Sequence, residues 1–197
     1  MPRKPPLQER IVDTAVELAD EVGWPAVRLR RVAERLGVSL MEIRAHYPDL
    51  DAVANAWFAR ADTVMLAVAE RADLVNAPAP DRIEAALTAW FTALGGRRRM
   101  LGSILSYKLQ PSHIHLQAAL VVATSRRVQW LREAARLDAT GRQKSLEESG
   151  LTLLFAATVL RWLNDRSENF ERTQGFIARR LALADRLMVA RAKAIER

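Results

Sequence analysis

The chain has 197 residues, of which 50% are hydrophobic and 27% are charged, and it carries a formal net charge of +7. This composition excludes an intrinsically disordered protein, and the absence of cysteine excludes disulfide frameworks, iron–sulfur clusters and cysteine nucleophiles. The first six residues lack the apolar core of a signal peptide, and the longest nearly apolar stretch, residues 150–160, is too short to cross a bilayer. We therefore expect a cytoplasmic protein.

The sequence predicts an all-α protein. All eight prolines fall where the apolar periodicity breaks, and no run of alternating apolar and polar residues resembles a set of strands. In the first predicted helix, Ile11, Ala15 and Leu18 recur at helical spacing, and Gly23 ends the helix. Asp81 is a predicted N-cap. The nine predicted helices cover residues 7–21, 27–36, 39–47, 50–72, 82–94, 97–107, 114–137, 146–164 and 168–193.

Positive charge is concentrated in the C-terminal half. Residues 1–50 carry 8 Lys or Arg and 8 Asp or Glu, whereas residues 97–197 carry 19 and 9. The N-terminal region therefore has no net field that attracts phosphates, so binding of nucleic acid there depends on a few well-placed residues.

Residues 27–48 have the spacing of a helix-turn-helix, with an amphipathic helix, a turn at Gly37 and a short second helix. Ser39 and Glu42 form the Ser-x-x-Glu pattern of a capping box, which fixes the start of the second helix. Two outward apolar residues of that helix are suited to contact thymine methyl groups, and a nearby arginine is suited to hold phosphate. The candidate DNA-binding residues are Arg28, Ser39, Leu40, Met41, Arg44 and His46.

Over residues 8–58 the sequence resembles the TetR family of bacterial repressors. The resemblance rests on Ile11-Val-Asp-Thr-Ala15, Gly23-Trp24, Leu29-Arg-Arg-Val-Ala33, Leu36-Gly-Val-Ser39 and His46-Tyr47-Pro48. It implies a TetR-like fold, with a three-helix DNA-binding head over residues 1–49 and a six-helix dimerisation and ligand-binding body over residues 50–197. The sequence departs from the family at Arg44, where a tyrosine is usual, and at Leu50, where a lysine is usual.

A second resemblance covers the C-terminal region. From Leu146 to Leu181 the sequence resembles the coenzyme Q accessory proteins, which are TetR-like and bind isoprenoid lipid, through an aliphatic helix, an acidic-serine turn and a final helix anchored by phenylalanine. This resemblance implies a lipid ligand, and membrane association is expected only under this alternative.

The stretch from residue 150 to residue 163 is apolar nearly all round, so it requires burial on every side. Either it is a core helix of one chain or, as the TetR resemblance implies, it pairs with a second copy in a homodimer. The candidate interface residues are Leu153, Phe155, Val159, Trp162, Phe176, Ile177, Leu181, Ala184 and Met188.

Other features suggest a binding protein. Large apolar residues on several predicted helices are candidates for a hydrophobic effector pocket or for ordinary core packing: Trp90, Met100, Ile104, Tyr107 and Trp130. The run Arg97–Arg99 is either an anion site or a solvated surface. His113 and His115 point to different helix faces and lack a third ligand, so no metal site is expected, and no cofactor motif appears. No catalytic motif appears either, and we expect no enzyme activity.

Two functional hypotheses follow. The first is a dimeric TetR-like regulator that represses by binding a double-stranded DNA operator and is released from it by a small hydrophobic effector. The alternative is a TetR-like lipid-binding accessory protein of ubiquinone biosynthesis that has lost DNA binding.

Overall fold

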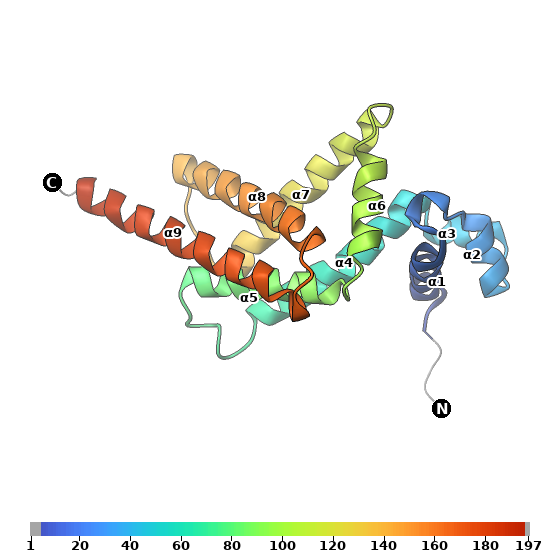
Figure 1. Cartoon of the computed structure of the whole chain (residues 1–197), viewed down its shortest axis with the longest axis horizontal. Coiled ribbons are helices and arrows are strands. Elements are labelled where there is room, and N and C mark those ends of the chain that lie inside the picture. Colours follow the sequence, from blue (N-terminus) through green and yellow to red (C-terminus); the bar gives the residue numbers. More distant parts are fainter. Residues whose placement is uncertain (1–4, 196–197) are drawn as a thin grey trace. The chain divides into compact units, whose positions relative to one another are not determined.

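The computed structural model describes residues 5–195, with side chains described as far as residue 186, and no strand occurs in that range. This confirms the predicted all-α class. Every helix in the described range is too short or too polar to cross a lipid bilayer. In chain order the elements are α1 (Leu7–Val22), η1 (Trp24–Ala26), α2 (Leu29–Leu36), α3 (Leu40–His46), α4 (Leu50–Ala69), α5 (Ala79–Ala93), α6 (Arg98–Lys108), α7 (Ile114–Ala134), α8 (Gly141–Leu163), η2 (Glu168–Phe170) and α9 (Glu171–Ile195), as Figure 1 shows.

The helices form two compact units. The first unit comprises Met1–Ala61 and Gly96–Gln117, and the second comprises Asp62–Gly95 and Ala118–Arg197. The first unit therefore contains α1, α2, α3, the first half of α4 and α6. This division differs from the expected boundary at residue 49, because α6 and half of α4 pack with the N-terminal helices.

The core of the first unit forms around α1. Ile11 is fully buried and Leu18 is 3% exposed, and the helix ends as predicted at Gly23, whose φ of 78° favours glycine. Trp24 is buried in the short 3-10 helix that follows. Because this turn and two extended residues, Val27 and Arg28, occupy the connection, the second helix begins at Leu29, two residues later than predicted.

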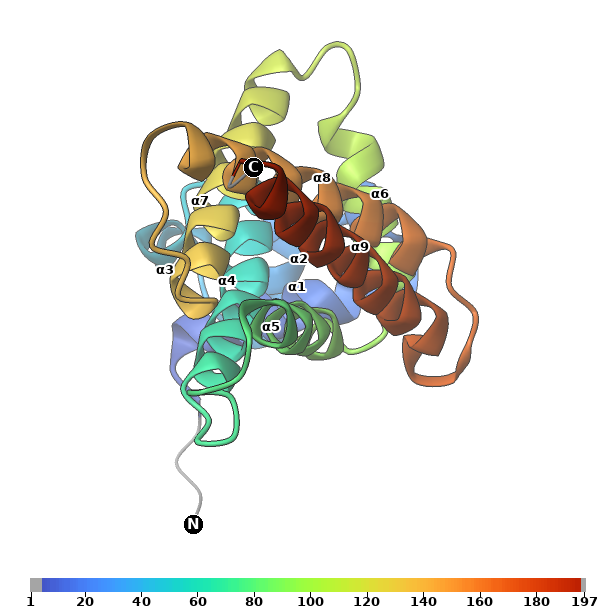
Figure 2. The ribbon, with the colours of Figure 1, turned by 90° about the vertical axis from the view of Figure 1, so that its left-hand side faces the viewer.

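The core of the second unit contains a cluster of four aromatic side chains. The ring of Trp90 lies 5.0 Å from that of Phe91 and 5.1 Å from that of Phe155, and the ring of Trp162 lies 5.5 Å from that of Phe91. These residues come from α5 and α8, and both helices pack against α9. Helices α8 and α9 lie side by side in Figures 1 and 2.

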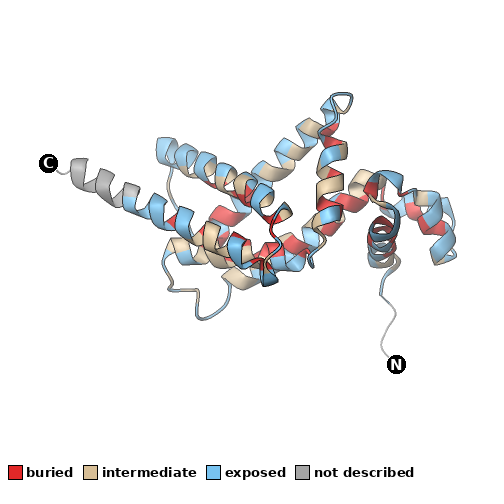
Figure 3. Ribbon diagram, in the orientation of Figure 1, coloured by how far each residue is buried: buried red, intermediate tan, exposed pale blue. Residues whose placement is uncertain are grey.

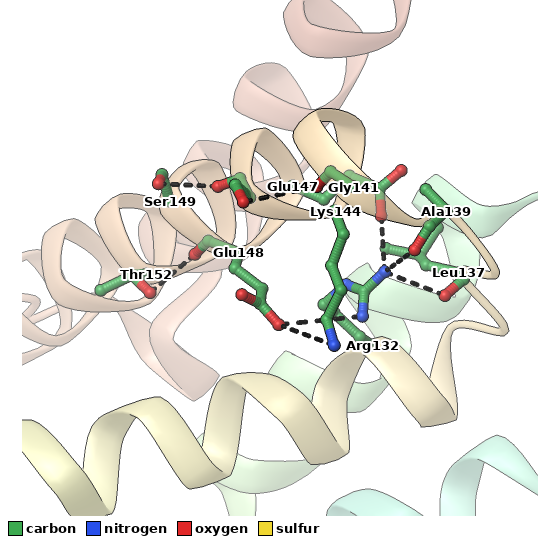
Figure 4. Close-up of polar contacts among 10 residues, drawn as sticks. Arg132, Leu137, Ala139, Gly141, Lys144, Glu147, Glu148, Ser149 and Thr152 are labelled. Carbon is green, nitrogen blue, oxygen red and sulfur yellow. Dashed lines mark hydrogen bonds and ion pairs between the residues drawn. The ribbon is translucent and has the colours of Figure 1, made fainter.

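Two helix starts differ from the predictions. Helix α5 begins at Ala79 after Pro78, so the prediction of Asp81 as N-cap is wrong. Helix α8 begins at Gly141, five residues before the predicted start. The reason is Arg132, which is 5% exposed and reaches α8 from α7. Its Nη2 donates to two carbonyl oxygens of the α7–α8 connection and to Glu147 Oε2 at 2.9 Å, which holds the first turns of α8 in place (Figure 4).

Burial on α8 is one-sided. Phe155 and Trp162 point into the core, whereas Leu153 is 72% exposed and Leu160 is 63% exposed. Figure 3 shows buried and exposed positions alternating along this helix. The expectation that its apolar residues are buried on every side is therefore not met within one protomer.

The connection from α8 to α9 is organised by Asp165, which is 4% exposed. Its carboxylate accepts hydrogen bonds from the backbone and hydroxyl groups of Ser167, at 2.8 and 2.5 Å, and of Thr173, at 2.8 and 2.6 Å. Burial raises the pKa of Asp165, but these four bonds outweigh burial and lower the pKa to about 2. The same bonds shape the 3-10 turn at Glu168–Phe170, so α9 begins at Glu171 and not at residue 168 as predicted.

We expect this carboxylate to make stability depend on pH. The folded-state pKa is below the ordinary value of 3.8, so the stabilisation is present above about pH 4 and is lost as the pH falls towards 2. The shift corresponds to about 2 kcal/mol. Urea unfolding between pH 5 and pH 2 measures it, with Asp165→Asn as the comparison. The variant should show a flatter decline, and equal declines in the two proteins contradict the assignment.

Candidate nucleic-acid interface

The start of α3 is fixed by the predicted capping box. Glu42 N donates to Ser39 Oγ at 3.2 Å, and Ser39 N donates to Glu42 Oε2 at 2.8 Å. The Ser39 hydroxyl also donates to Glu42 Oε2 at 2.8 Å. Hydrogen bonds from the backbone and then the side chain of Ser39 lower the pKa of Glu42. The preceding Gly37 has a φ of 66°, so the turn before α3 needs the left-handed conformation that glycine tolerates.

The inner side of α3 anchors it to the first unit. Ile43 is 1% exposed and Tyr47, which follows the helix, is 6% exposed. The Tyr47 hydroxyl donates to the backbone oxygen of Gln8 at 3.3 Å, which ties the end of α3 to the start of α1. The helix is therefore held at its start by a cap and at its end by a buried aromatic side chain.

The outer side of α3 is open. Met41 is 80% exposed and Leu40 is 54% exposed, while Arg44 and His46 are also exposed. A groove of about 340 Å³, which we call the α3 groove, is lined by Leu29, Leu40, Met41, Ile43, Arg44 and Tyr47. Five of its six lining residues are apolar or aromatic, and Arg44 is the charged one.

The arginines near α3 differ in what they contact. Arg28, a predicted DNA contact, donates to the backbone oxygens of Pro25 and Val27 at 2.7 and 2.8 Å, so its guanidinium is already held by the protein. Arg30 and Arg35 are each paired with a glutamate. Arg44 makes no hydrogen bond or ion pair with another residue that the structure describes. Of the two arginines among the candidate DNA-binding residues, Arg44 is therefore the one whose guanidinium is available to a phosphate.

Helix α6 is fastened to the other helices of the first unit by two ion pairs that sequence reasoning missed. Near its start, Arg97 Nε donates to Asp20 Oδ2 at 3.1 Å. At its end, the buried ammonium of Lys108 is paired with the carboxylate of Asp51 in the first turn of α4. The run Arg97–Arg99 therefore begins with a residue that holds α6 against α1.

The predicted effector residues are distributed over both units. Trp90 and Trp130 belong to the second unit, whereas Met100, Ile104 and Tyr107 belong to the first. Trp90, Met100 and Ile104 are at most 3% exposed, but Trp130 is 55% exposed. Trp90, Met100 and Ile104 therefore lie in protein cores.

Trp90 is also part of a polar contact inside the second unit. Its Nε1 donates to Asp62 Oδ1 at 2.6 Å, and Arg127 donates to the same carboxylate. The guanidinium of Arg127 lies 5.0 Å from the centroid of the Trp90 ring and 5.6 Å from that of Phe155. Charged and aromatic groups therefore share one partly buried cluster.

The predicted interface residues divide into three groups by burial. Phe155, Trp162, Ile177 and Leu181 are at most 7% exposed in one protomer, which corrects their placement at a surface, because their side chains form its core. Val159 and Phe176 are half-buried, and Leu153 and Ala184 are exposed. The side chain of Met188 lies outside the described residues.

The chain is similar to two solved structures of bacterial regulators. It is 42% identical to the TetR transcriptional regulator from Nitrosomonas europaea ATCC 19718, with 92% of this chain and 99% of that chain covered and a TM-score of 0.81. A regulatory protein in the tetR family from Rhodococcus RHA1 is 21% identical, with 93% and 97% covered and a TM-score of 0.53, which shows a similar fold. The COQ9 family model matches residues 149–188. No curated protein matches the chain.

Proposed function

Because this chain belongs to the TetR family of transcriptional regulators, we propose that it binds double-stranded operator DNA as a homodimer through the outer side of α3. The observation that carries this proposal is the capped helix with an exposed outer side, where Arg44 has no partner among the described residues. A helix held at both ends is suited to enter a major groove, and its cation is suited to hold a phosphate. The activity is one of binding, and we propose no catalytic step.

An apolar stripe on α8 supports the homodimer. Leu146, Leu153 and Leu160 repeat every seven residues and are 58%, 72% and 63% exposed. Between the first two lies Gly150, where an added Cβ would meet no atom of the same protomer within 4 Å. Glycine in a helix costs about 1 kcal/mol relative to alanine, and nothing within the protomer requires it here. A closely approaching helix of a second copy explains both features.

The contacts of Arg132 leave this stripe clear of charge. Arg132 lies 2.9 Å from Glu147 and 3.9 Å from Glu148, so both carboxylates at the start of α8 are directed towards α7 (Figure 4). From residue 149 to residue 160 the sequence of α8 contains no charged residue. Two copies paired along it would present two α3 helices to a two-fold symmetric operator.

We further propose that a hydrophobic effector controls DNA binding. We place this site in the second unit, beside the packed aromatic cluster of Trp90, Phe91 and Phe155. An effector with a higher affinity for one arrangement of the dimer shifts the population towards it, and release from DNA follows if that arrangement misplaces α3.

The COQ9 match favours a second candidate function, a lipid-binding accessory protein. The match lies within the second unit and contains α8 from residue 149 onwards together with the Asp165 turn. Native mass spectrometry of gently purified protein distinguishes the two functions. A co-purified polyisoprenoid together with no binding to any duplex supports the lipid function, and operator binding by ligand-free protein supports the regulator.

The DNA-binding function is tested by Arg44→Ala. We expect the variant to bind the protein's own upstream DNA about a hundredfold more weakly, because a charge-assisted hydrogen bond to phosphate is lost in each of the two protomers. The slope of log affinity against log salt should fall by about two, one for each lost phosphate contact. A salt titration by fluorescence anisotropy measures both.

The matched control is Arg30→Ala. Arg30 is an exposed arginine on α2 that already lies 3.5 Å from Glu34. Its removal should therefore change both the affinity and the salt slope less than Arg44→Ala does. Equal effects of the two substitutions would show that only general positive charge matters and would remove Arg44 from its proposed role.

A further inference from the structure

The outer side of α3 presents apolar side chains where DNA-reading helices commonly carry hydrogen-bonding ones. Leu40 and Met41 are adjacent at the start of the helix, and both are more than half exposed. Ala45 continues this surface one turn later and is exposed. Exposing two large apolar side chains side by side has no benefit for the isolated protomer, because apolar surface is stabilised by removal from water.

The polar groups at the start of α3 are used within the helix. The Ser39 hydroxyl both accepts from Glu42 N and donates to Glu42 Oε2. The same carboxylate oxygen also accepts from Ser39 N. Turning either side chain towards a base would break the capping box, which is worth about 1 kcal/mol. Hydrogen-bond reading of bases by these two residues is therefore opposed by the fold.

The lining of the α3 groove indicates which chemical group of a base α3 would contact. The apolar lining consists of Leu40, Met41 and Ile43 from α3 together with Leu29 and Tyr47 from the neighbouring segments. In the major groove, the edges of guanine, cytosine and adenine present hydrogen-bonding groups, and only thymine presents an apolar group, its C5-methyl. The surface chemistry of α3 matches that methyl group.

We infer that the α3 groove selects operators by the methyl groups of thymine, which Leu40 and Met41 contact while Arg44 holds the backbone. This inference rests on the proposed DNA-binding function and assigns its specificity. It predicts half-sites in which thymine is required at one or two positions because of its methyl group and not because of its hydrogen-bonding pattern.

The experiment begins with selection of bound duplexes from a random-sequence library by the full-length protein. The selected duplex is then synthesised with uracil in place of each half-site thymine, which removes the methyl group and leaves the hydrogen-bonding groups unchanged. We expect the affinity to fall about fourfold for each methyl group lost, the effect of removing one buried carbon. Replacement in both half-sites should lower it more than tenfold.

Two variants identify the side chain that contacts the thymine methyl group. Of the variants Met41→Ala and Leu40→Ala, one should bind the thymine duplex and the uracil duplex with nearly equal affinity, because it lacks the side chain that contacted the methyl group. Both side chains are exposed, so neither substitution should impair folding. The control is Val22→Ala, at an exposed aliphatic residue of α1 outside the groove, which should retain the full difference between thymine and uracil.

The outcomes separate this inference from the proposed function. Tight, selective binding with equal affinity for thymine and uracil duplexes, or selection of half-sites without thymine, overturns methyl recognition and leaves the regulator function in place. Failure to enrich any sequence above non-specific binding overturns the regulator function together with the inference.

Discussion

Replacing Lys108 by alanine lowers the free energy of unfolding by about 3 kcal/mol. The Lys108 side chain is 4% exposed and that of Asp51 is 22% exposed, so removal of the ammonium leaves a largely buried carboxylate without its counter-charge. Chemical denaturation of the full chain measures the loss. The double variant Lys108→Met with Asp51→Leu removes both charges and should recover most of the stability, because no unpaired charge then remains.

The matched control is the other ion pair of α6. The side chains of Arg97 and Asp20 are 39% and 49% exposed, so Arg97→Ala should cost less than about 1 kcal/mol. If Arg97→Ala and Lys108→Ala destabilise the protein equally, or if the double variant is no more stable than Lys108→Ala, burial of the Lys108 pair does not carry the stability that we assign to it.

These two ion pairs could not be predicted from the sequence, whereas local features of the fold could. The capping box and the Gly37 turn were predictable because their signals are local, within three residues of each other. Lys108 and Asp51 are 57 positions apart, and a lysine near a helix end ordinarily indicates a solvated residue. Only the packing of α6 against the other helices of the first unit brings the two charges together.

The same distinction applies to the candidate site. The sequence indicated which α3 residues point outward, because helical periodicity determines the inner position of Ile43 and the outer positions of Leu40 and Met41. It did not indicate that Arg28 bonds to backbone oxygens, because that depends on the conformation of the preceding 3-10 turn. Likewise, apolar composition on α8 could not separate Phe155, which fills the core, from Leu153, which is exposed.

Replacing Gly150 by leucine should stabilise the protomer and yet break the dimer. Within one protomer an added Cβ meets nothing within 4 Å, and leucine has a higher helix propensity than glycine, so the free energy of unfolding should rise by up to about 1 kcal/mol. At a two-fold interface the added side chains lie close to the partner in both copies. Overpacking costs about 1 to 3 kcal/mol for each of the two added side chains, so the dimer dissociation constant should rise on the order of 10²-fold.

Sedimentation velocity over a range of concentrations measures the dissociation constant, and thermal unfolding at high dilution measures the protomer. Leu153→Glu should also break the dimer by placing a charge in the apolar stripe, whereas Leu109→Glu, at a similarly exposed leucine in the first unit, should not. Because a monomer engages one half-site at a time, Gly150→Leu should also weaken operator binding strongly. A Gly150→Leu protein that remains fully dimeric places the interface elsewhere and leaves the glycine in α8 without a partner to explain it.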